Sequence, residues 1–281
     1  AREDFSDYEM PIRDFAACLP RMTACKVNAS LPIFSKRYYS PWRLQGRRLL
    51  ASTAKLGAQI FGEFPAPVLV PNHRLQTMPI VWKSIESVGR LGAIVSALES
   101  ARAVLLLRHP CGYVASVLRG EAGGSFTGAI SASEDYGIFE MLLHTPQARG
   151  RGVTLSHLRR LSPVERLAWR GALYNEKAMA DIRGRRDAVT VRYEDVCENP
   201  IAKARELFEF VGLSWNRQTA EFISTSTSAE QQAYYSVIKD PTKAANKWRT
   251  ELSPDDQRRI MDIVRDTIPG RLYREDPQPD R

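Results

Sequence analysis

Residues 104–120 have the sequence VLLLRHPCGYVASVLRG, in which an apolar run ends at an arginine and a proline follows two residues later. The apolar run is typical of a buried strand, and Pro110 predicts a helix that begins directly after it. Arg108 therefore stands at the carboxyl end of a strand and next to a helix N-terminus, and both features attract anions. This arrangement predicts a phosphate site. The alternative is a structural arginine that covers the edge of the sheet.

Length and composition predict a folded domain with anionic partners. The chain has 281 residues, of which 43% are hydrophobic and 26% charged, and its formal net charge is +8 at pH 7. The length suits one large α/β domain. The basic residues are spread along the chain with no run of five or more, so we expect an anionic small molecule rather than nucleic acid as partner. A solvated basic surface is the alternative.

The cysteine pattern and the apolar runs predict neither a metal site nor a membrane span. The four cysteines show no CxxC or zinc-type spacing, and they are Cys18, Cys25, Cys111 and Cys197. Cys18 and Cys25 are close enough in sequence to pair, although we expect reduced thiols at this density. No apolar stretch reaches the length of a membrane span.

Alternating strand and helix patterns predict an α/β fold. The expected strands are residues 79–82, 103–107 and 189–193. The expected helices are residues 41–64, 91–98, 163–182, 199–211, 216–223 and 254–268. The first two strands and their connecting helix form a βαβ unit, so these strands should be parallel, with Lys83 and Arg108 at their carboxyl ends. Residues 120–152, rich in Gly, Ser and Thr, predict a mobile loop or lid.

Two motifs carry a family resemblance. Arg108-His109-Pro110 followed by Ser116 resembles the 3'-phosphate motif of the sulfotransferases that use 3'-phosphoadenosine-5'-phosphosulfate (PAPS), where His109 would be a spacer. The run VTVRYEDVCENPIAKARELFEFVGL at residues 189–213 resembles the strand–RYEDL–helix segment of the same family. Lys83 and Arg90 before the RHP strand look more like the carbohydrate and bacterial branches than the small-molecule cytosolic branch.

This resemblance implies both a fold and a reaction. The implied fold is an α/β three-layer sandwich, with a central parallel sheet flanked by helices in a P-loop NTPase-like sulfotransferase domain over residues 1–281. The implied reaction transfers a sulfuryl group from PAPS to a hydroxyl of a carbohydrate or small-molecule acceptor, leaving 3'-phosphoadenosine-5'-phosphate (PAP), without a metal. One alternative is a catalytically inactive nucleotide-binding or scaffold protein of the same fold. Another is a kinase-like phosphoryl transferase, against which the lack of a G-K-[ST] loop argues.

The resemblance also assigns donor-binding residues one by one. It places Arg108 and Ser116 at the 3'-phosphate, and Tyr193 and Thr225 at the adenine. Lys243 stands where the family has a basic loop before a tryptophan, although the glycines of that loop are missing here. Alternatives from the residues alone are a core tyrosine at position 193 and a solvated stripe of Lys239, Lys243 and Lys247.

For the chemistry, the resemblance points to Lys83 and Glu86. Lys83 matches the strand-end Lys near the reaction centre of the family. The small-molecule branch has a catalytic His two residues later, where this chain has Ile85, so we expect Glu86 to be the base. The alternative is that Glu86 is an exposed glutamate at a helix start.

The 5'-phosphosulfate loop of the family, a P-R-S-G-T-like turn after a strand, does not occur in these 281 residues. Because the chain begins with Ala1 rather than Met, we expect an N-terminal strand and this loop to be missing from the sequence, the alternative being loss of activity. We expect a cytoplasmic protein, or one of the Golgi or secretory lumen if it is a eukaryotic carbohydrate enzyme. The sequence does not indicate an oligomeric state.

Overall fold

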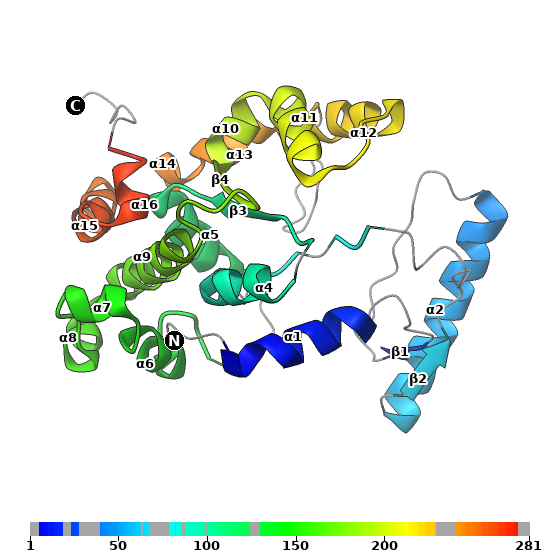
Figure 1. Cartoon of the computed structure of the whole chain (residues 1–281), viewed down its shortest axis with the longest axis horizontal. Helices are drawn as coiled ribbons and strands as arrows, with labels where there is room; N and C mark the ends of the chain where they lie inside the picture. Colours follow the sequence, from blue (N-terminus) through cyan, green and yellow to red (C-terminus); the bar gives the residue numbers. More distant parts are fainter. Residues whose placement is uncertain are drawn as a thin grey trace. The chain divides into compact units, whose positions relative to one another are not determined.

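The structure, a computed structural model, describes residues 6–18, 24–27, 40–62, 64–67, 79–81, 83–85, 88–98, 100–123, 130–228 and 240–274 (Figure 1). The chain divides into two compact units, Pro11–Trp82 and Lys83–Arg281 with Ala1–Met10. Helix α1 (Ser6–Cys18) crosses the boundary between these sets of residues. The expectation of one domain over residues 1–281 stays a prediction.

The smaller unit contains a long helix and a two-stranded antiparallel sheet. The helix predicted at residues 41–64 is α2 (Pro41–Phe61). The sheet was not predicted: β1 (Ala24–Val27) pairs with β2 (Phe64–Pro67), so Pro65 and Pro67 lie within a strand. Proline cannot donate to a strand ladder, but it is tolerated on an edge, and both strands of a two-stranded sheet are edges.

A pair of parallel strands organises the larger unit. β3 (Ala103–Leu107) pairs with β4 (Ala188–Arg192), in a register that runs from Ala103 opposite Ala188 to Leu107 opposite Arg192. β4 therefore ends one residue earlier than the strand predicted at residues 189–193, and Tyr193 already begins a helix. The chain returns from β3 to β4 through a series of helices, which is the connection that parallel strands require. The predicted α/β class is confirmed, but the parallel partner of β3 is β4 rather than the strand predicted at residues 79–82.

Most of the predicted helices of this unit are present, with shifted ends. Ser162 and Glu165 form a capping box at the start of α9, whereas Asn199 precedes α11 without a side-chain cap. The helices, including the 3-10 turn η2, are η2 (Val88–Arg90), α4 (Leu91–Ala97), α5 (Pro110–Ala122), α6 (Tyr136–Leu143), α7 (Pro146–Gly150), α8 (Leu155–Arg160), α9 (Pro163–Asp181), α10 (Tyr193–Glu198), α11 (Pro200–Val211), α12 (Arg217–Thr227), α13 (Pro241–Asn246), α14 (Trp248–Glu251), α15 (Pro254–Val264) and α16 (Ile268–Arg271).

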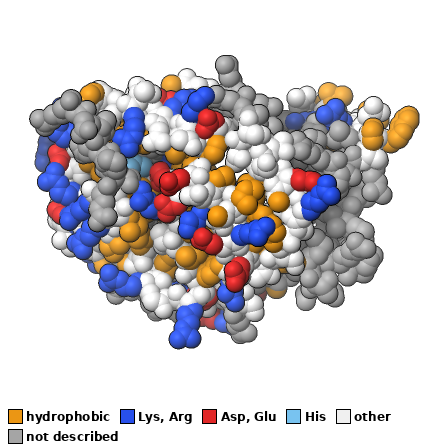
Figure 2. Space-filling model, turned by 90° about the horizontal axis from the view of Figure 1, so that it is seen from above, with side chains coloured by type: hydrophobic (Ala, Val, Ile, Leu, Met, Phe, Trp, Pro, Cys, Tyr) orange, Lys and Arg blue, Asp and Glu red, His pale blue; other side chains and the backbone are white. Residues whose placement is uncertain are grey.

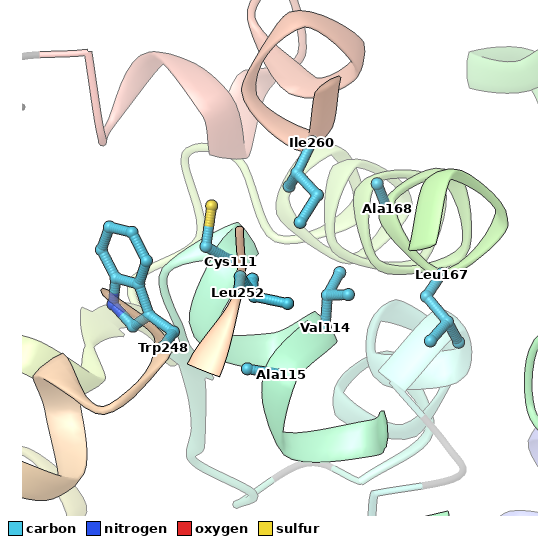
Figure 3. Close-up of a cluster of buried hydrophobic side chains, with 8 residues drawn as sticks. All are labelled: Cys111, Val114, Ala115, Leu167, Ala168, Trp248, Leu252 and Ile260. Atoms are coloured by element: carbon cyan, nitrogen blue, oxygen red, sulfur yellow. The ribbon is translucent and has the colours of Figure 1, made fainter. Parts of the chain in front are cut away.

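The main core of this unit lies where α5, α9, α14 and α15 meet. Figure 3 shows its side chains converging from these helices: Cys111, Val114, Ala115, Leu167, Ala168, Trp248, Leu252 and Ile260. A second cluster packs Leu105 of β3 against Ala178 and Ile182 at the end of α9. These two clusters hold the beginning of α5 and the strand β3 against α9, and so fix the place of the residues between them.

The two faces of β3 differ in exposure. Leu105 and Leu107 are buried, whereas Leu106 is 52% exposed on the opposite face. On the surface shown in Figure 2, Lys and Arg side chains lie among Asp and Glu side chains rather than in one separate patch. On this face, the net positive charge of the chain is therefore not gathered in one basic patch.

Two predictions of local structure are wrong. Residues 79–81 form no strand, and Val81 is 75% exposed; Trp82 lies outside the described residues. A short apolar run becomes a strand only where another strand supplies hydrogen bonds, and none pairs with this one among the described residues. The stretch predicted as a mobile loop contains α6 and α7, each started by a side-chain cap, from Asp135 and Thr145.

Candidate functional site

The candidate site lies at the carboxyl ends of β3 and β4. Leu107 and Arg192 are the last register partners of the two strands, so Arg108 and Tyr193 are the residues that follow them. Each of these two residues stands where a helix follows a strand, α5 after β3 and α10 after β4. Parallel sheets commonly bind ligands at this edge. The structure thus brings together two residues that lie 85 positions apart, and both were predicted from the motifs.

Arg108 is held by α13 and by the ring of Tyr193. One terminal nitrogen, Nη2, donates a hydrogen bond to the carbonyl oxygen of Ala244 at 3.2 Å. The guanidinium carbon lies 4.9 Å from the centre of the Tyr193 ring, which is cation–π geometry. The Nε–H is buried and has no hydrogen-bond partner among the described residues. A buried donor without a partner is costly, so an acceptor that reached this nitrogen would be favoured.

Tyr193 offers a neutral hydroxyl and an aromatic face to this site. Burial and a hydrogen bond with the Cys197 thiol raise the pKa of Tyr193, and the charge of Arg108 opposes this rise in part. Burial likewise raises the pKa of Cys197, which is a free buried cysteine. Tyr193 is therefore uncharged at neutral pH, and its ring can stack on a cation or on an aromatic ligand.

The start of α5 is tightly packed. His109 is 4% exposed and stacks on Trp248, with ring centres 4.2 Å apart and planes 7° apart. Its Nδ1 accepts the backbone N–H of Cys111 at 3.2 Å, so His109 caps the helix, in accord with its expected role as a spacer. A Cβ on Gly112 would lie 3.1 Å from Nε of Arg108 and 3.3 Å from Trp248, so a glycine suits this close approach.

The structure places the other predicted donor-binding residues on α5, α12 and α13. Ser116 lies half-buried on α5. Lys243 is exposed on α13, 3.9 Å from Asp240, one residue before the carbonyl that Arg108 binds. Thr225 lies on α12, where its hydroxyl donates to the carbonyl oxygen of Glu221 at 2.7 Å. Among the described residues no hydrogen bond or ring contact joins Thr225 to Tyr193 or Arg108.

The expected stripe of three lysines does not lie on one helix. Asp240 caps α13, and Lys247 is the residue between α13 and α14. Lys239 lies outside the described residues. The three lysines do not share one helical face, because α13, which contains Lys243, begins at Pro241 after the cap Asp240 and ends before Lys247.

The residues predicted for the chemistry are not brought to Arg108 by any described contact. Lys83 is exposed and follows no strand, and it has no ion pair among the described residues. Glu86 lies outside the described residues. In the part of the chain that the structure describes, there is no cluster of His, Cys, Asp and Glu arranged to hold a metal ion. No helix among the described residues is both long enough and apolar enough to span a membrane.

Sequence reasoning missed the groups that surround the strand ends. Glu194 accepts the backbone N–H of His109 at 3.0 Å and the hydroxyl of Tyr273 at 2.8 Å. No sequence pattern pointed to Tyr273. Its sequence signal is weak, because an isolated tyrosine near the C-terminus follows no local pattern. Nothing in the sequence marks the carbonyl of Ala244, because every residue carries a backbone carbonyl.

Comparison with known proteins points to one enzyme class. Carbohydrate sulfotransferase 1 of Danio rerio is 35% identical over 78 residues, which is 26% of this chain and 18% of that protein. Carbohydrate sulfotransferase 3 of Mus musculus is 37% identical over 70 residues, 24% of this chain and 14% of that protein. About a quarter of this chain is thus similar in sequence to carbohydrate sulfotransferases. The similarity spans less than a fifth of the length of these two relatives.

Among solved structures, the sulfotransferase domain from the curacin biosynthetic pathway superposes with a TM-score of 0.40 at 15% identity. This superposition covers 78% of this chain and 72% of that domain. No protein-family model matches the sequence. The predicted resemblance to sulfotransferases is confirmed by these curated relatives, whereas the role of each site residue stays a prediction.

Proposed function

We propose that this chain forms the 3'-phosphate and adenine side of a donor site for PAPS, in an enzyme that transfers a sulfuryl group to a hydroxyl of a saccharide or small molecule. The observation that carries the proposal is Arg108. Its guanidinium stands at the carboxyl end of β3, stacks on Tyr193 and keeps a buried Nε–H that no described residue accepts. A phosphate oxygen is the acceptor that fits such a donor best.

Donor binding would change the contacts of Arg108. The cavity beside Arg108, lined also by Leu107, Tyr113 and Pro269, has a volume of about 20 Å3, which is room for one water molecule. A phosphate does not fit in this cavity, and we expect it to approach from the side where Nη2 now binds the carbonyl oxygen of Ala244. We expect the phosphate to replace this carbonyl, so that α13 shifts when the nucleotide binds.

Each predicted residue has a distinct role in this scheme. Arg108 and Ser116 bind the 3'-phosphate, and the ring of Tyr193 faces the adenine, with Thr225 assigned to the adenine by resemblance alone. Lys243 adds positive charge near the same phosphate, because α13 carries both Lys243 and the carbonyl that Arg108 holds. None of these groups reacts. They select a nucleotide that carries a 3'-phosphate.

In the transfer itself, the acceptor oxygen forms a bond to sulfur as the bond from sulfur to the 5'-phosphate oxygen of the donor breaks. PAP leaves, and the acceptor hydroxyl gives up its proton. We assign proton removal to Glu86 and stabilisation of the negative charge on the transferring group to Lys83. The acceptor is proposed to be a saccharide because the relatives of this chain are named carbohydrate sulfotransferases.

A sulfur-35 transfer assay tests the activity. Labelled PAPS is incubated with the full-length protein and a panel of neutral and acidic saccharides, and label in the saccharide is counted. Transfer that falls to background in Lys83→Ala supports the proposal. Tight binding of PAP without transfer to any acceptor would support the inactive nucleotide-binding alternative instead. Binding of ATP without binding of PAP would refute the sulfotransferase assignment.

A further inference from the structure

The backbone on both sides of Arg108 is fixed by two side chains that lie far away in sequence. The carbonyl oxygen of Leu107 lies 3.2 Å from the hydroxyl of Tyr273, and the N–H of His109 donates to Oε1 of Glu194 at 3.0 Å. The same tyrosine hydroxyl lies 2.8 Å from Oε2 of Glu194. A tyrosine has a single hydroxyl proton, so its hydrogen bond is shared between the carboxylate, which lies closer, and the carbonyl oxygen.

This network is closely packed around Tyr273, whereas Glu194 is half-buried. Tyr273 is 2% exposed. The edge of its ring meets the ring of His109 at a centre-to-centre distance of 5.0 Å, with planes 75° apart. The guanidinium carbon of Arg192 lies 4.6 Å from the centre of the Tyr273 ring. Arg192 is the register partner of Leu107, so the tyrosine ties together the ends of both strands.

We infer that Glu194 and Tyr273 are positioning residues that set the direction of the Arg108 side chain for the 3'-phosphate, an inference that rests on the proposed function. Among the described residues, no hydrogen bond, ion pair or ring contact joins either side chain to the Arg108 guanidinium. They act on the residues before and after it, Leu107 and His109. Glu194 belongs to α10 and Tyr273 to the C-terminal segment, so the site is assembled from three separate parts of the chain.

The physical reason is the length of an arginine side chain. A small rotation of the backbone at Arg108 would move its guanidinium away from the Tyr193 ring and from the place where a phosphate must sit. Side chains that bind ligands through a fork of two hydrogen bonds need their supporting groups fixed to within about 0.5 Å. The Glu194–Tyr273 pair provides two such supports, one on each neighbouring peptide group.

Two isomeric ligands isolate this effect. Adenosine 3'-phosphate and adenosine 5'-phosphate have the same composition and charge and differ in where the phosphate is attached. Their dissociation constants are measured by calorimetry with the full chain and with Tyr273→Phe and Glu194→Gln. The ratio of the two constants reports selectivity for the 3'-phosphate, and a general loss of folded protein does not change it.

Thr145→Val is the matched control. Thr145 is also 2% exposed, and its hydroxyl also makes two hydrogen bonds, donating to the carbonyl oxygen of Leu142 and accepting the N–H of Ala148. It stands between α6 and α7, away from the strand ends. Thermal unfolding of all variants shows how much stability each change removes, so selectivity is compared at similar losses of stability.

We expect Tyr273→Phe and Glu194→Gln each to lower the selectivity for the 3'-phosphate about two- to tenfold, the range for one lost hydrogen bond, while Thr145→Val leaves it unchanged. If the unaltered protein selects adenosine 3'-phosphate and both variants select it equally well, the positioning role is wrong and the pair is merely structural. If the unaltered protein does not distinguish the two nucleotides, the proposed function fails, and this inference with it.

Discussion

The change Arg108→Lys keeps a positive charge at the end of β3 and removes the planar fork of the guanidinium. In the structure, Nη2 is bonded to the carbonyl oxygen of Ala244 and Nε is buried without a described partner. A phosphate could therefore accept two parallel hydrogen bonds from arginine and only one from the shorter lysine. The lysine also loses the stacking on the Tyr193 ring.

The expected loss follows from these contacts. One hydrogen bond to a charged group contributes about 1.5 to 3 kcal/mol, which corresponds to about ten- to 150-fold in a dissociation constant. We therefore expect PAP to bind Arg108→Lys weaker by about this factor. Adenosine 5'-phosphate lacks the 3'-phosphate, and its affinity should change by less than about threefold, the effect of the lost stacking alone.

Arg102→Lys is the matched control, and calorimetry with both nucleotides is the assay. Arg102 also donates to a backbone carbonyl, that of Phe210 at 2.9 Å, and also lies over an aromatic ring, 5.7 Å from the centre of Phe210. It precedes the amino end of β3, opposite to Arg108. The reasoning is refuted if Arg108→Lys weakens PAP no more than Arg102→Lys does, or weakens both nucleotides equally.

Three further predictions concern packing and ionisation around the site. Gly112→Ala should lower stability by about 1 to 3 kcal/mol, measured by urea unfolding, and should weaken PAP binding, because the new methyl group presses on the Arg108 side chain. Burial raises the pKa of Cys111 from its ordinary value of 9.0 to about 12. The stability that Cys111 adds relative to Cys111→Ala should therefore be full below pH 9 and decline as the pH rises toward 12. Ser162→Ala should cost about 0.5 to 2 kcal/mol by the loss of a helix cap. The hydrogen bond from Ser162 lowers the pKa of Glu165 below its ordinary 4.5, so the difference from Ser162→Ala should shrink as the pH falls below that value.

Each of these changes has a control in the chain. Gly150→Ala adds a methyl group to another helical glycine with nothing within 4 Å, and it should leave stability and PAP binding unchanged. Val114→Ala empties space in the same core as Cys111 without a titrating group, so its cost should not depend on pH. Ser214→Ala alters an exposed serine and should be neutral. Equal effects of a variant and its control would contradict the corresponding prediction.

Local chemistry is what made part of this structure predictable. The strand at residues 103–107 and the helix at Pro110 follow from an apolar run and a proline, and both are present. The helix predicted at residues 163–182 starts with a capping box of Ser162 and Glu165, which depends only on residues three apart. Arg108 and Tyr193 lie together because each follows one of two parallel strands, which end at the same edge of the sheet.

What could not be predicted depends on contacts between distant segments. Residues 79–81 are as apolar as a strand, yet no neighbour pairs with them among the described residues. Pro65 and Pro67 argue against a strand, and only the pairing with β1 makes one. Tyr273 reaches a carbonyl 166 positions earlier in the chain, so no local pattern could reveal it.

A structure of the full chain with PAP bound tests the central claim most directly. The account predicts that an oxygen of the 3'-phosphate lies about 2.7 to 2.9 Å from Nε of Arg108, within reach of Ser116, and that the carbonyl of Ala244 has been displaced from Nη2. A complex in which the 3'-phosphate lies elsewhere, while Arg108 keeps its bond to Ala244, would contradict the account.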